Sequence, residues 1–220
     1  MKLKYYSLTA ITTVALSALV PSVSADVITD WNLITINATK TGGLNSNLGT
    51  RIDAIESIAV YDAVNSIEQF GTSYHYYSPP GGPASPEAAA IQAAYSVLTN
   101  YFPAQLPALN TNLTNSLNAI PDGVEKDNGR AVGVASAADI IALRANDGSS
   151  PNVTYPGPGS IVVGAYQLTP NVPTVTTPPF TFANGINQQW GNVTPFVLTN
   201  ASQFRPPPPP AVAAPNITRR

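Results

Sequence analysis

Proline is unevenly distributed along this chain of 220 residues, and its distribution limits where helices can form. Of the 22 prolines, 14 lie after Gly148, mixed with Thr, Asn and Gly. Proline lacks a backbone N–H and interrupts both helices and central strands. Residues 149–220 are therefore predicted to form a proline-rich extended connector, with polyproline II structure at residues 206–210. Several aromatic residues are expected to pin this coil to a folded body: Phe180, Phe182, Trp190, Phe196 and Phe204.

Before Gly148, apolar residues recur at the spacing of amphipathic helices. Residues 51–70 place apolar side chains three or four positions apart and polar side chains on the opposite arc. The apolar set is Ile52, Ile55, Ala59, Ala63, Ile67 and Phe70, and the polar set is Asp53, Ser57, Tyr61, Asn65 and Glu68. Ser85-Pro86 is typical of an N-cap followed by proline at the first helical position, which predicts a second helix to about residue 102. A third apolar stripe covers residues 106–120.

A fourth helix is predicted from Asp122, which forms a capping-box pattern with Glu125, to about Gly148. This segment is rich in alanine and glycine. Small side chains let a neighbouring helix approach closely, so we expect this helix to lie in the middle of the bundle and to be the most buried. Residues 26–148 are thus predicted to be a helical domain. The expected fold class is all-α, a helical bundle followed by a long proline-rich coil.

The first 25 residues have the pattern of a secretory signal peptide. Lys2 and Lys4 precede a short apolar stretch, and small residues at positions 23 and 25 suit a cleavage site. A membrane anchor is the alternative, but threonine and serine interrupt an apolar core shorter than the roughly 20 residues that span a bilayer. We therefore predict removal of residues 1–25, no membrane span after cleavage, and an exported protein, periplasmic or extracellular.

The charge balance limits the partners that this chain can have. Its 10 basic and 12 acidic residues become 8 basic and 12 acidic after cleavage, because Lys2 and Lys4 are removed. Binding to phosphate backbones requires clustered Lys and Arg, so nucleic acid is not an expected partner. Cysteine is absent, which excludes thiolate chemistry, cysteine metal sites and disulfides.

The inventory of catalytic side chains is small. His75 is the only histidine, and it lies in an aromatic, proline-flanked loop, so we expect a packed or solvated side chain and not a ligand. Asp53, Glu56 and Asp62 resemble a carboxylate set for glycoside or metal chemistry. However, only Glu56 falls inside the apolar arc, which favours a buried, hydrogen-bonded carboxylate over a catalytic one.

Two further clusters of charge have structural explanations. Arg144 is expected to form an ion pair with Asp139 or Asp147 on the fourth helix. A calcium loop at residues 122–127 is disfavoured, because the alternating ligands and the closing glutamate are missing. The sequence thus predicts no catalytic, cofactor-binding or metal-binding residue in this chain.

The order of several short motifs resembles a known family. These motifs are Trp31-Asn32, Tyr61-Asp62-Ala63-Val64-Asn65, Ala84-Ser85, Asp122-Gly123, Arg144-Ala145-Asn146-Asp147-Gly148 and, in the coil, Trp190, Pro195-Phe196 and Gln203-Phe204-Arg205-Pro206. Together they resemble the N-terminal helical half of the bacterial vanadium-dependent haloperoxidases and their type 2 phosphatidic acid phosphatase relatives. The resemblance implies an exported helical enzyme fold whose chemistry lies in a second, C-terminal helical bundle.

The family's catalytic motifs have no counterpart here. The resemblance implies a Lys followed by Arg-Pro, then Pro-Ser-Gly-His, then an Arg and a later His, which together hold vanadate or phosphate. Arg205-Pro206 is the only Arg-Pro pair, with Leu198 where the lysine is required, and Pro-Ser-Gly-His is absent. Vanadate belongs to the full-length haloperoxidases, and no cofactor is expected in this chain. Whether the chain is an enzyme, and which branch it resembles, stay open.

Two functions remain compatible with the sequence. The first is the non-catalytic N-terminal portion of a haloperoxidase-like or phosphatase-like protein, truncated and inactive alone. The second is a stand-alone exported helical binding protein that uses its aromatic, proline-rich coil. The first implies an apolar face left uncovered on the third and fourth predicted helices and the coil, and therefore self-association of the isolated chain.

Overall fold

The computed structural model describes residues 26–155, 169–170, 182–183 and 185–207. Five α-helices account for most of the described residues: α1 (Val27–Thr41), α2 (Ser46–Glu68), α3 (Pro86–Tyr101), α4 (Leu106–Asn118) and α5 (Val124–Arg144). Two short 3₁₀ helices, η1 (Pro103–Gln105) and η2 (Gln188–Asn192), and a minimal antiparallel pair, β1 (Thr169–Pro170) with β2 (Phe182–Ala183), complete the elements. The predicted signal peptide and residues 208–210 of the proline run lie outside the described residues.

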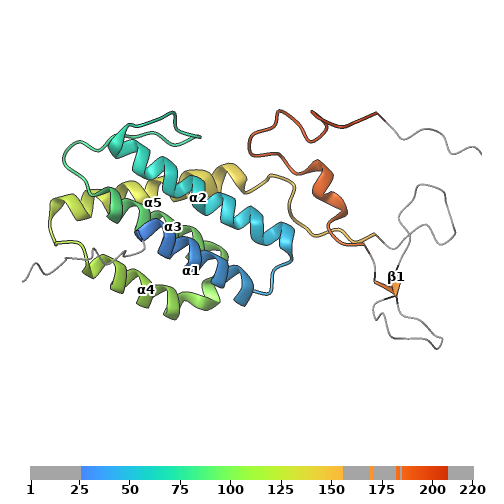
Figure 1. Ribbon diagram of the computed structural model, residues 1–220, viewed down its shortest axis with the longest axis horizontal. Coiled ribbons are helices and arrows are strands. Elements are labelled where there is room, and N and C mark those ends of the chain that lie inside the picture. The colour runs from blue at the N-terminus through green and yellow to red at the C-terminus, as the bar shows by residue number, and fades with distance from the viewer. Residues whose placement is uncertain (1–25, 156–168, 171–181, 184, 208–220) are drawn as a thin grey trace, which may run out of the picture.

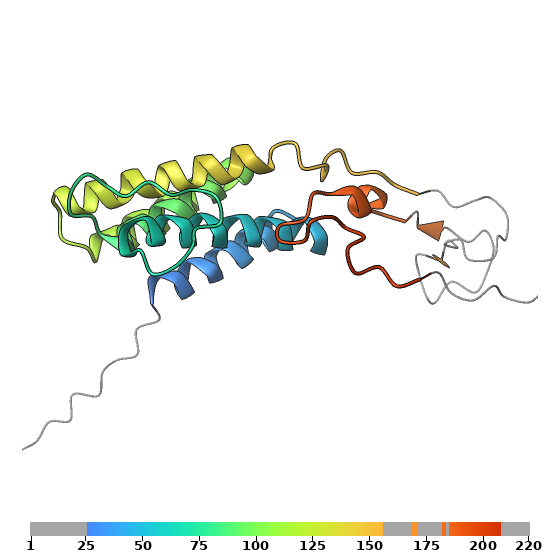
Figure 2. The ribbon, with the colours of Figure 1, turned by 90° about the horizontal axis from the view of Figure 1, so that it is seen from above.

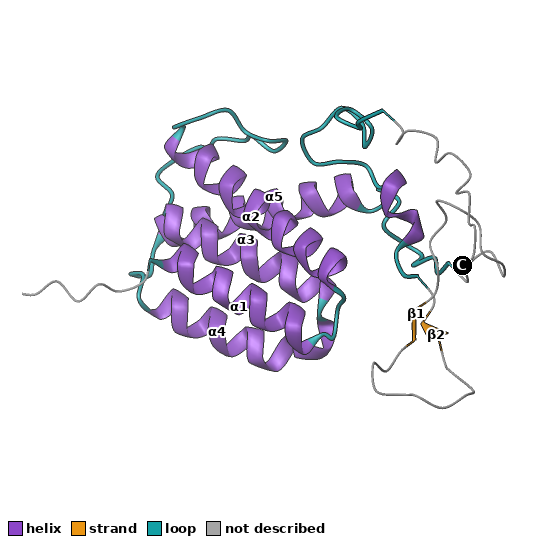
Figure 3. Ribbon diagram, turned by 45° about the vertical axis from the view of Figure 1, so that its right-hand side comes forward, coloured by secondary structure: helices purple, strands orange, loops and turns teal. Residues whose placement is uncertain are grey.

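The helices form one bundle with α3 at its centre. In Figures 1 and 3 the helices lie side by side, and α3 contacts all four of the others. Its buried side chains are mostly alanine, with larger residues toward the C-terminal end: Ala88, Ala89, Ala90, Ile91, Ala93, Ala94, Val97 and Leu98. Residues 26–148 are therefore all-helical, as predicted. The helix at the centre of the bundle is not the predicted one.

The alanine-rich helix α5 lies on one side of the bundle, opposite α1 in the view of Figure 2. The prediction that it is the most buried helix is wrong, because several of its small residues face solvent: Ala131, Ala138, Ala142 and Ala145. Its glycines do provide the expected close approach. A Cβ added at Gly129 would lie 2.3 Å from the carbonyl oxygen of Ser85, and one at Gly133 would lie 2.4 Å from that of Ala89. Two glycines, and not the alanines, therefore set the distance between α5 and α3.

The predicted N-cap of α3 is confirmed, whereas that of α5 is not. The Ser85 hydroxyl accepts a hydrogen bond from the Ala88 amide at 3.1 Å, and Pro86 is the first helical residue. At α5 the N-cap is Gly123, whose φ of +152° suits glycine. This conformation leaves Asp122 outside the helix, where its carboxylate pairs with Lys126 Nζ at 2.8 Å. The capping-box prediction at Asp122 and Glu125 is therefore wrong.

The loop between α2 and α3 covers the polar side of α2. Asp62 accepts hydrogen bonds from the backbone amides of Tyr74, His75 and Tyr76 at 2.6–2.9 Å. Asn65 exchanges two hydrogen bonds with the backbone of Gly71, and both Asp62 and Asn65 are buried. Periodicity places Asn65 on the polar arc, but this loop buries it, because its amide satisfies the loop backbone.

None of the helices in the described part of the chain is both long and apolar enough to cross a membrane.

Candidate functional site

The most connected polar cluster in the described residues joins the start of α2 to the end of α5. Arg51 Nε donates to Asp147 Oδ2 at 2.7 Å, and Arg51 Nη2 donates to the carbonyl oxygen of Arg144 at 2.8 Å. Arg144 Nη2 lies 2.9 Å from the same Asp147 oxygen. All three side chains are buried. We call Arg51, Arg144 and Asp147 the guanidinium clamp.

The guanidinium clamp also holds the coil that follows α5. Arg144 donates to the carbonyl oxygen of Thr194 at 2.5 Å, and its guanidinium lies 4.0 Å from the centre of the Phe196 ring. The Thr194 amide donates to the carbonyl oxygen of Asp147 at 2.8 Å. One arginine therefore combines backbone hydrogen bonds with a cation–π contact, which fixes the coil against α5.

Two further contacts attach the same coil to the helices. The Tyr74 hydroxyl donates to the carbonyl oxygen of Phe196 at 2.6 Å. The side-chain amides of Asn45 and Asn187 pair with each other at 3.2 and 3.4 Å, and Asn45 is at the same time the N-cap of α2. The prediction that aromatic residues pin the coil therefore holds for Phe196, which packs against the core. It is wrong for Phe204, whose side chain is 78% exposed.

The electrostatics of the guanidinium clamp agree with its geometry. Burial by itself lowers the pKa of Arg51, but the hydrogen bond to Asp147 and the neighbouring Tyr101 more than offset it, so the pKa is raised overall. Burial likewise raises the pKa of Asp147, and the hydrogen bonds from Arg51 and Ser149 outweigh this effect, so the pKa lies below its ordinary value. The clamp is therefore ionised at neutral pH, and loses its stabilising effect only in acid as Asp147 is protonated.

The sequence identified only part of this cluster. The predicted ion pair of Arg144 with Asp147 is confirmed, and the alternative partner Asp139 instead contacts His75. Arg51 was not singled out, because it precedes the apolar stripe of α2 and has no partner near in sequence. Its partner Asp147 is 96 residues away, so no local pattern could reveal the contact.

Replacing Arg144 by lysine is expected to release the coil at Thr194. An ammonium group cannot reproduce the planar fork that reaches Thr194, Pro195 and Asp147 together. Hydrogen exchange of the Thr194 amide should then accelerate by about tenfold or more. Arg130→Lys is the matched control on the same helix, since Arg130 bonds only the Gln92 side chain. Unchanged exchange at Thr194 in Arg144→Lys would show that the coil does not depend on the clamp.

Glu56 is the most unusual carboxyl group among the described residues. Its side chain is 1% exposed, Oε1 has no hydrogen-bond partner, and Oε2 lies 3.5 Å from the Ser57 hydroxyl. Burial raises its pKa to about 7, with a smaller contribution from the neighbouring carboxylate of Asp53. The predicted burial of Glu56 is confirmed, but its predicted hydrogen bonding is almost absent. Because Asp62 is used to hold the loop, the three carboxylates do not act as one set.

His75 lies half-exposed on the loop between α2 and α3, and its Nδ1 contacts Asp139 Oδ2 on α5. This contact ties the loop to α5 and uses one ring nitrogen. In the described ranges no group of three or more His, Cys, Asp or Glu side chains is arranged to hold a metal ion. Asp122, Glu125 and Asp127 are all exposed at the start of α5.

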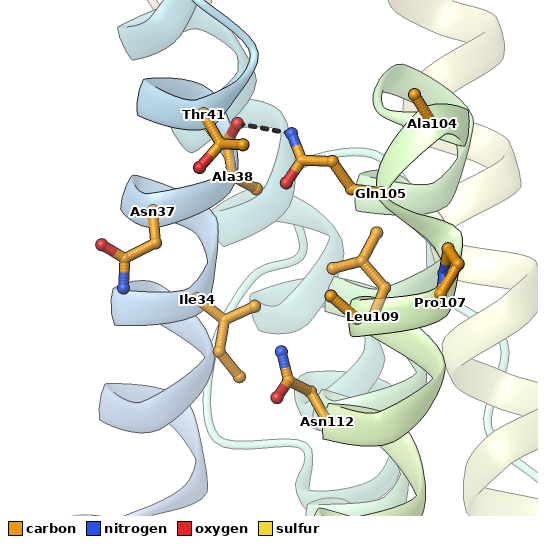
Figure 4. Close-up of a pocket in the computed structure, with 10 residues that line it drawn as sticks. Ile34, Asn37, Ala38, Thr41, Ala104, Gln105, Pro107, Leu109 and Asn112 are labelled. Carbon is orange, nitrogen blue, oxygen red and sulfur yellow. Dashed lines mark hydrogen bonds between the residues drawn. The ribbon is translucent and has the colours of Figure 1, made fainter.

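A groove of about 510 Å³ runs between α1 and α4. Figure 4 shows its lining, in which Ile34 and Ala38 of α1 lie opposite Leu109 and Asn112 of α4, while the side chain of Asn37 points away from α4. Gln105 bridges the groove, because its Nε2 donates to the carbonyl oxygen of Ala38 at 2.9 Å. The lining carries amides, aliphatic groups and the Thr41 hydroxyl, and it has no charged side chain. The groove therefore has neither a nucleophile activated by a base nor a cation for an oxyanion.

The described residues thus contain a buried cluster of two arginines and Asp147, a buried carboxyl group at Glu56 that has almost no hydrogen bonds, and an uncharged groove. Comparison of this chain with protein-family models, with curated proteins and with solved structures finds no match.

Proposed function

We propose that this chain is the non-catalytic helical portion of an exported protein similar to the vanadium-dependent haloperoxidases and type 2 phosphatidic acid phosphatases, inactive by itself. One observation supports this proposal above others. Five residues on which the resemblance rests hold the fold together, and they do not converge on one cavity: Trp31, Asp62, Asn65, Arg144 and Asp147. Such use of motif residues is expected of a supporting domain and not of a reaction centre.

These structural roles are specific. Trp31 is buried and donates its indole N–H to Ser116 of α4 at 3.2 Å. Asp62 and Asn65 hold the loop after α2. Arg144 and Asp147 belong to the guanidinium clamp. Most polar groups of these side chains are therefore bonded to partners within the chain, with Arg144 Nε as an exception, which leaves few of them for a substrate.

The residue inventory supports the same proposal. Stabilising a trianionic oxyanion takes several convergent cations and a positioned acid or base. This chain contains one histidine, His75, and the arginines Arg51 and Arg144 share the carboxylate of Asp147, so their net positive charge is too small for a trianion. In the proposed function, the groups that hold vanadate or phosphate belong to a different part of the protein.

An activity assay on the purified chain tests this proposal. We expect no tight binding of vanadate by vanadium NMR and no hydrolysis of a phosphate monoester above the buffer rate. His75→Ala should leave both results unchanged, because the His75 ring contacts Asp139, and the His75 backbone amide, which alanine keeps, donates to Asp62. Halide oxidation by peroxide and vanadate that His75→Ala abolishes would overturn the proposal.

A stand-alone exported binding protein is the second candidate function. It is favoured by apolar side chains that the coil exposes, among them Val197 at 89% and Phe204 at 78%.

We also propose self-association through the exposed apolar residues of α5 and the coil, including Val134 and Leu143. Light scattering distinguishes self-association from a stand-alone binding protein. Concentration-dependent association that Leu143→Ser weakens supports an uncovered apolar face. A stable monomer that binds no hydrophobic dye supports the binding protein.

A further inference from the structure

A separate cavity of about 470 Å³ lies at the end of the bundle where α2 begins and where α3 and α5 end. Four aliphatic side chains form much of its lining: Leu44, Leu48, Ile52 and Ile141. Arg51 and Arg144 of the guanidinium clamp line the same cavity. The cavity therefore combines apolar walls with two cationic side chains, a pairing typical of small-molecule sites.

The charges around this cavity do not balance. Arg51 and Arg144 share one carboxylate, Asp147, and neither forms an ion pair with any other carboxylate in the described part of the chain. Arginine stays protonated at physiological pH. The last carbonyl groups of α3 and α5 also lie at this end, and their partial negative charge offsets part of the excess. The start of α2 lies at this end too and adds partial positive charge, so a positive excess of less than one charge remains, which suits a monoanion better than a dianion.

Two of the polar side chains that line this cavity, Arg51 and Arg144, are guanidinium groups, which donate hydrogen bonds and accept none. Arg144 Nε is buried and has no hydrogen-bond partner among the described residues. Tyr101, Ser149 and Ser150 add hydroxyl groups to the lining. A guanidinium only donates, so a ligand that binds beside these two arginines is favoured when it offers acceptors. A carboxylate offers two acceptor oxygens and matches the planar guanidinium.

We propose that this cavity binds a small monocarboxylate whose apolar body lies along the aliphatic walls. The carboxylate faces the guanidinium groups, and the tail contacts Leu48, Ile52 and Ile141. Most of the affinity comes from the buried tail, because the excess positive charge is small. The site is independent of the proposed function, since the guanidinium clamp forms the same cavity in a supporting domain and in a stand-alone protein.

Titration of the full chain with hexanoate and with hexanamide tests the recognition of charge. The two probes have the same tail and differ in one negative charge. We expect saturable hexanoate binding by calorimetry, and hexanamide binding weaker by about tenfold or more. Equal binding of the two probes, or no saturable binding of hexanoate to the folded chain, would refute the proposal.

A pair of variants at Ala145 tests the location. Ala145 lines the cavity and is exposed at the end of α5, so a longer side chain there leaves the core intact. Ala145→Glu places a carboxylate beside the ligand and should weaken hexanoate binding by about tenfold. Ala145→Gln has the same shape without the charge and should bind within about twofold of the natural chain. Binding that Ala145→Glu leaves unchanged would place the carboxylate elsewhere and contradict the proposal.

Discussion

Between pH 5 and pH 8 the natural chain is expected to lose about 2–3 kcal/mol of stability, and Glu56→Gln is expected to remove this loss. In the folded chain, burial raises the pKa of Glu56 from its ordinary 4.5 to about 7. The folded state therefore holds this proton more tightly than the unfolded state does. As the pH rises from 4.5 toward 7, the unfolded chain ionises first, so the free energy of unfolding falls, and above pH 7 the loss is complete. Glutamine does not titrate and removes this dependence.

Urea denaturation at both pH values measures the effect on Glu56. The comparison between variants cancels other groups that titrate in the same range, including Asp53, whose pKa burial also raises. Glu68→Gln is the matched control, because Glu68 lies exposed on the same helix and should keep the full pH dependence. If Glu56→Gln and the natural chain lost equal stability between pH 5 and pH 8, Glu56 would be solvated and not buried.

Gly133→Ala is expected to destabilise the bundle by about 2 kcal/mol, although alanine is a better helix former than glycine. A Cβ at this position would lie 2.4 Å from the carbonyl oxygen of Ala89 and 2.8 Å from the amide nitrogen of Ala93. Both contacts are to the backbone of α3, so α3 and α5 must move apart to accept one methyl group. This cost exceeds the gain of about 1 kcal/mol that alanine offers over glycine within a helix.

Gly49→Ala gives the matched comparison, because Gly49 also lies inside a helix but has no close neighbour. The nearest atom to its added Cβ is the Thr39 Cβ at 3.9 Å. This substitution should stabilise the chain by up to about 1 kcal/mol, so the two glycine-to-alanine changes are expected to have opposite signs in thermal denaturation. A stabilising effect at Gly133 as well would mean that α5 does not pack on α3 there.

Local patterns in the sequence predicted four of the five α-helices that the structure describes, and α1 had no such pattern. The apolar period of residues 51–70 predicted the body of α2, which the structure places at Ser46–Glu68. The prediction is wrong for Phe70, which lies beyond the end of the helix and is exposed. Ser85-Pro86 predicted the start of α3, because an N-cap is a contact between residues three apart. The burial of Glu56 also followed from its place in the apolar arc. These features depend on neighbours within one or two turns, so the sequence alone contains them.

Only the tertiary structure decided which helix lies at the centre and which polar side chains are buried. The alanine content of α5 predicted the centre, but α3 occupies it, because its small residues face neighbours on more than one side. Asn65 is buried by a loop and Arg51 by a partner 96 residues away. Contacts between distant segments leave no periodic trace in the chain, since their geometry exists only after the helices pack. The guanidinium clamp and the cavity beside it are therefore properties of the folded protein.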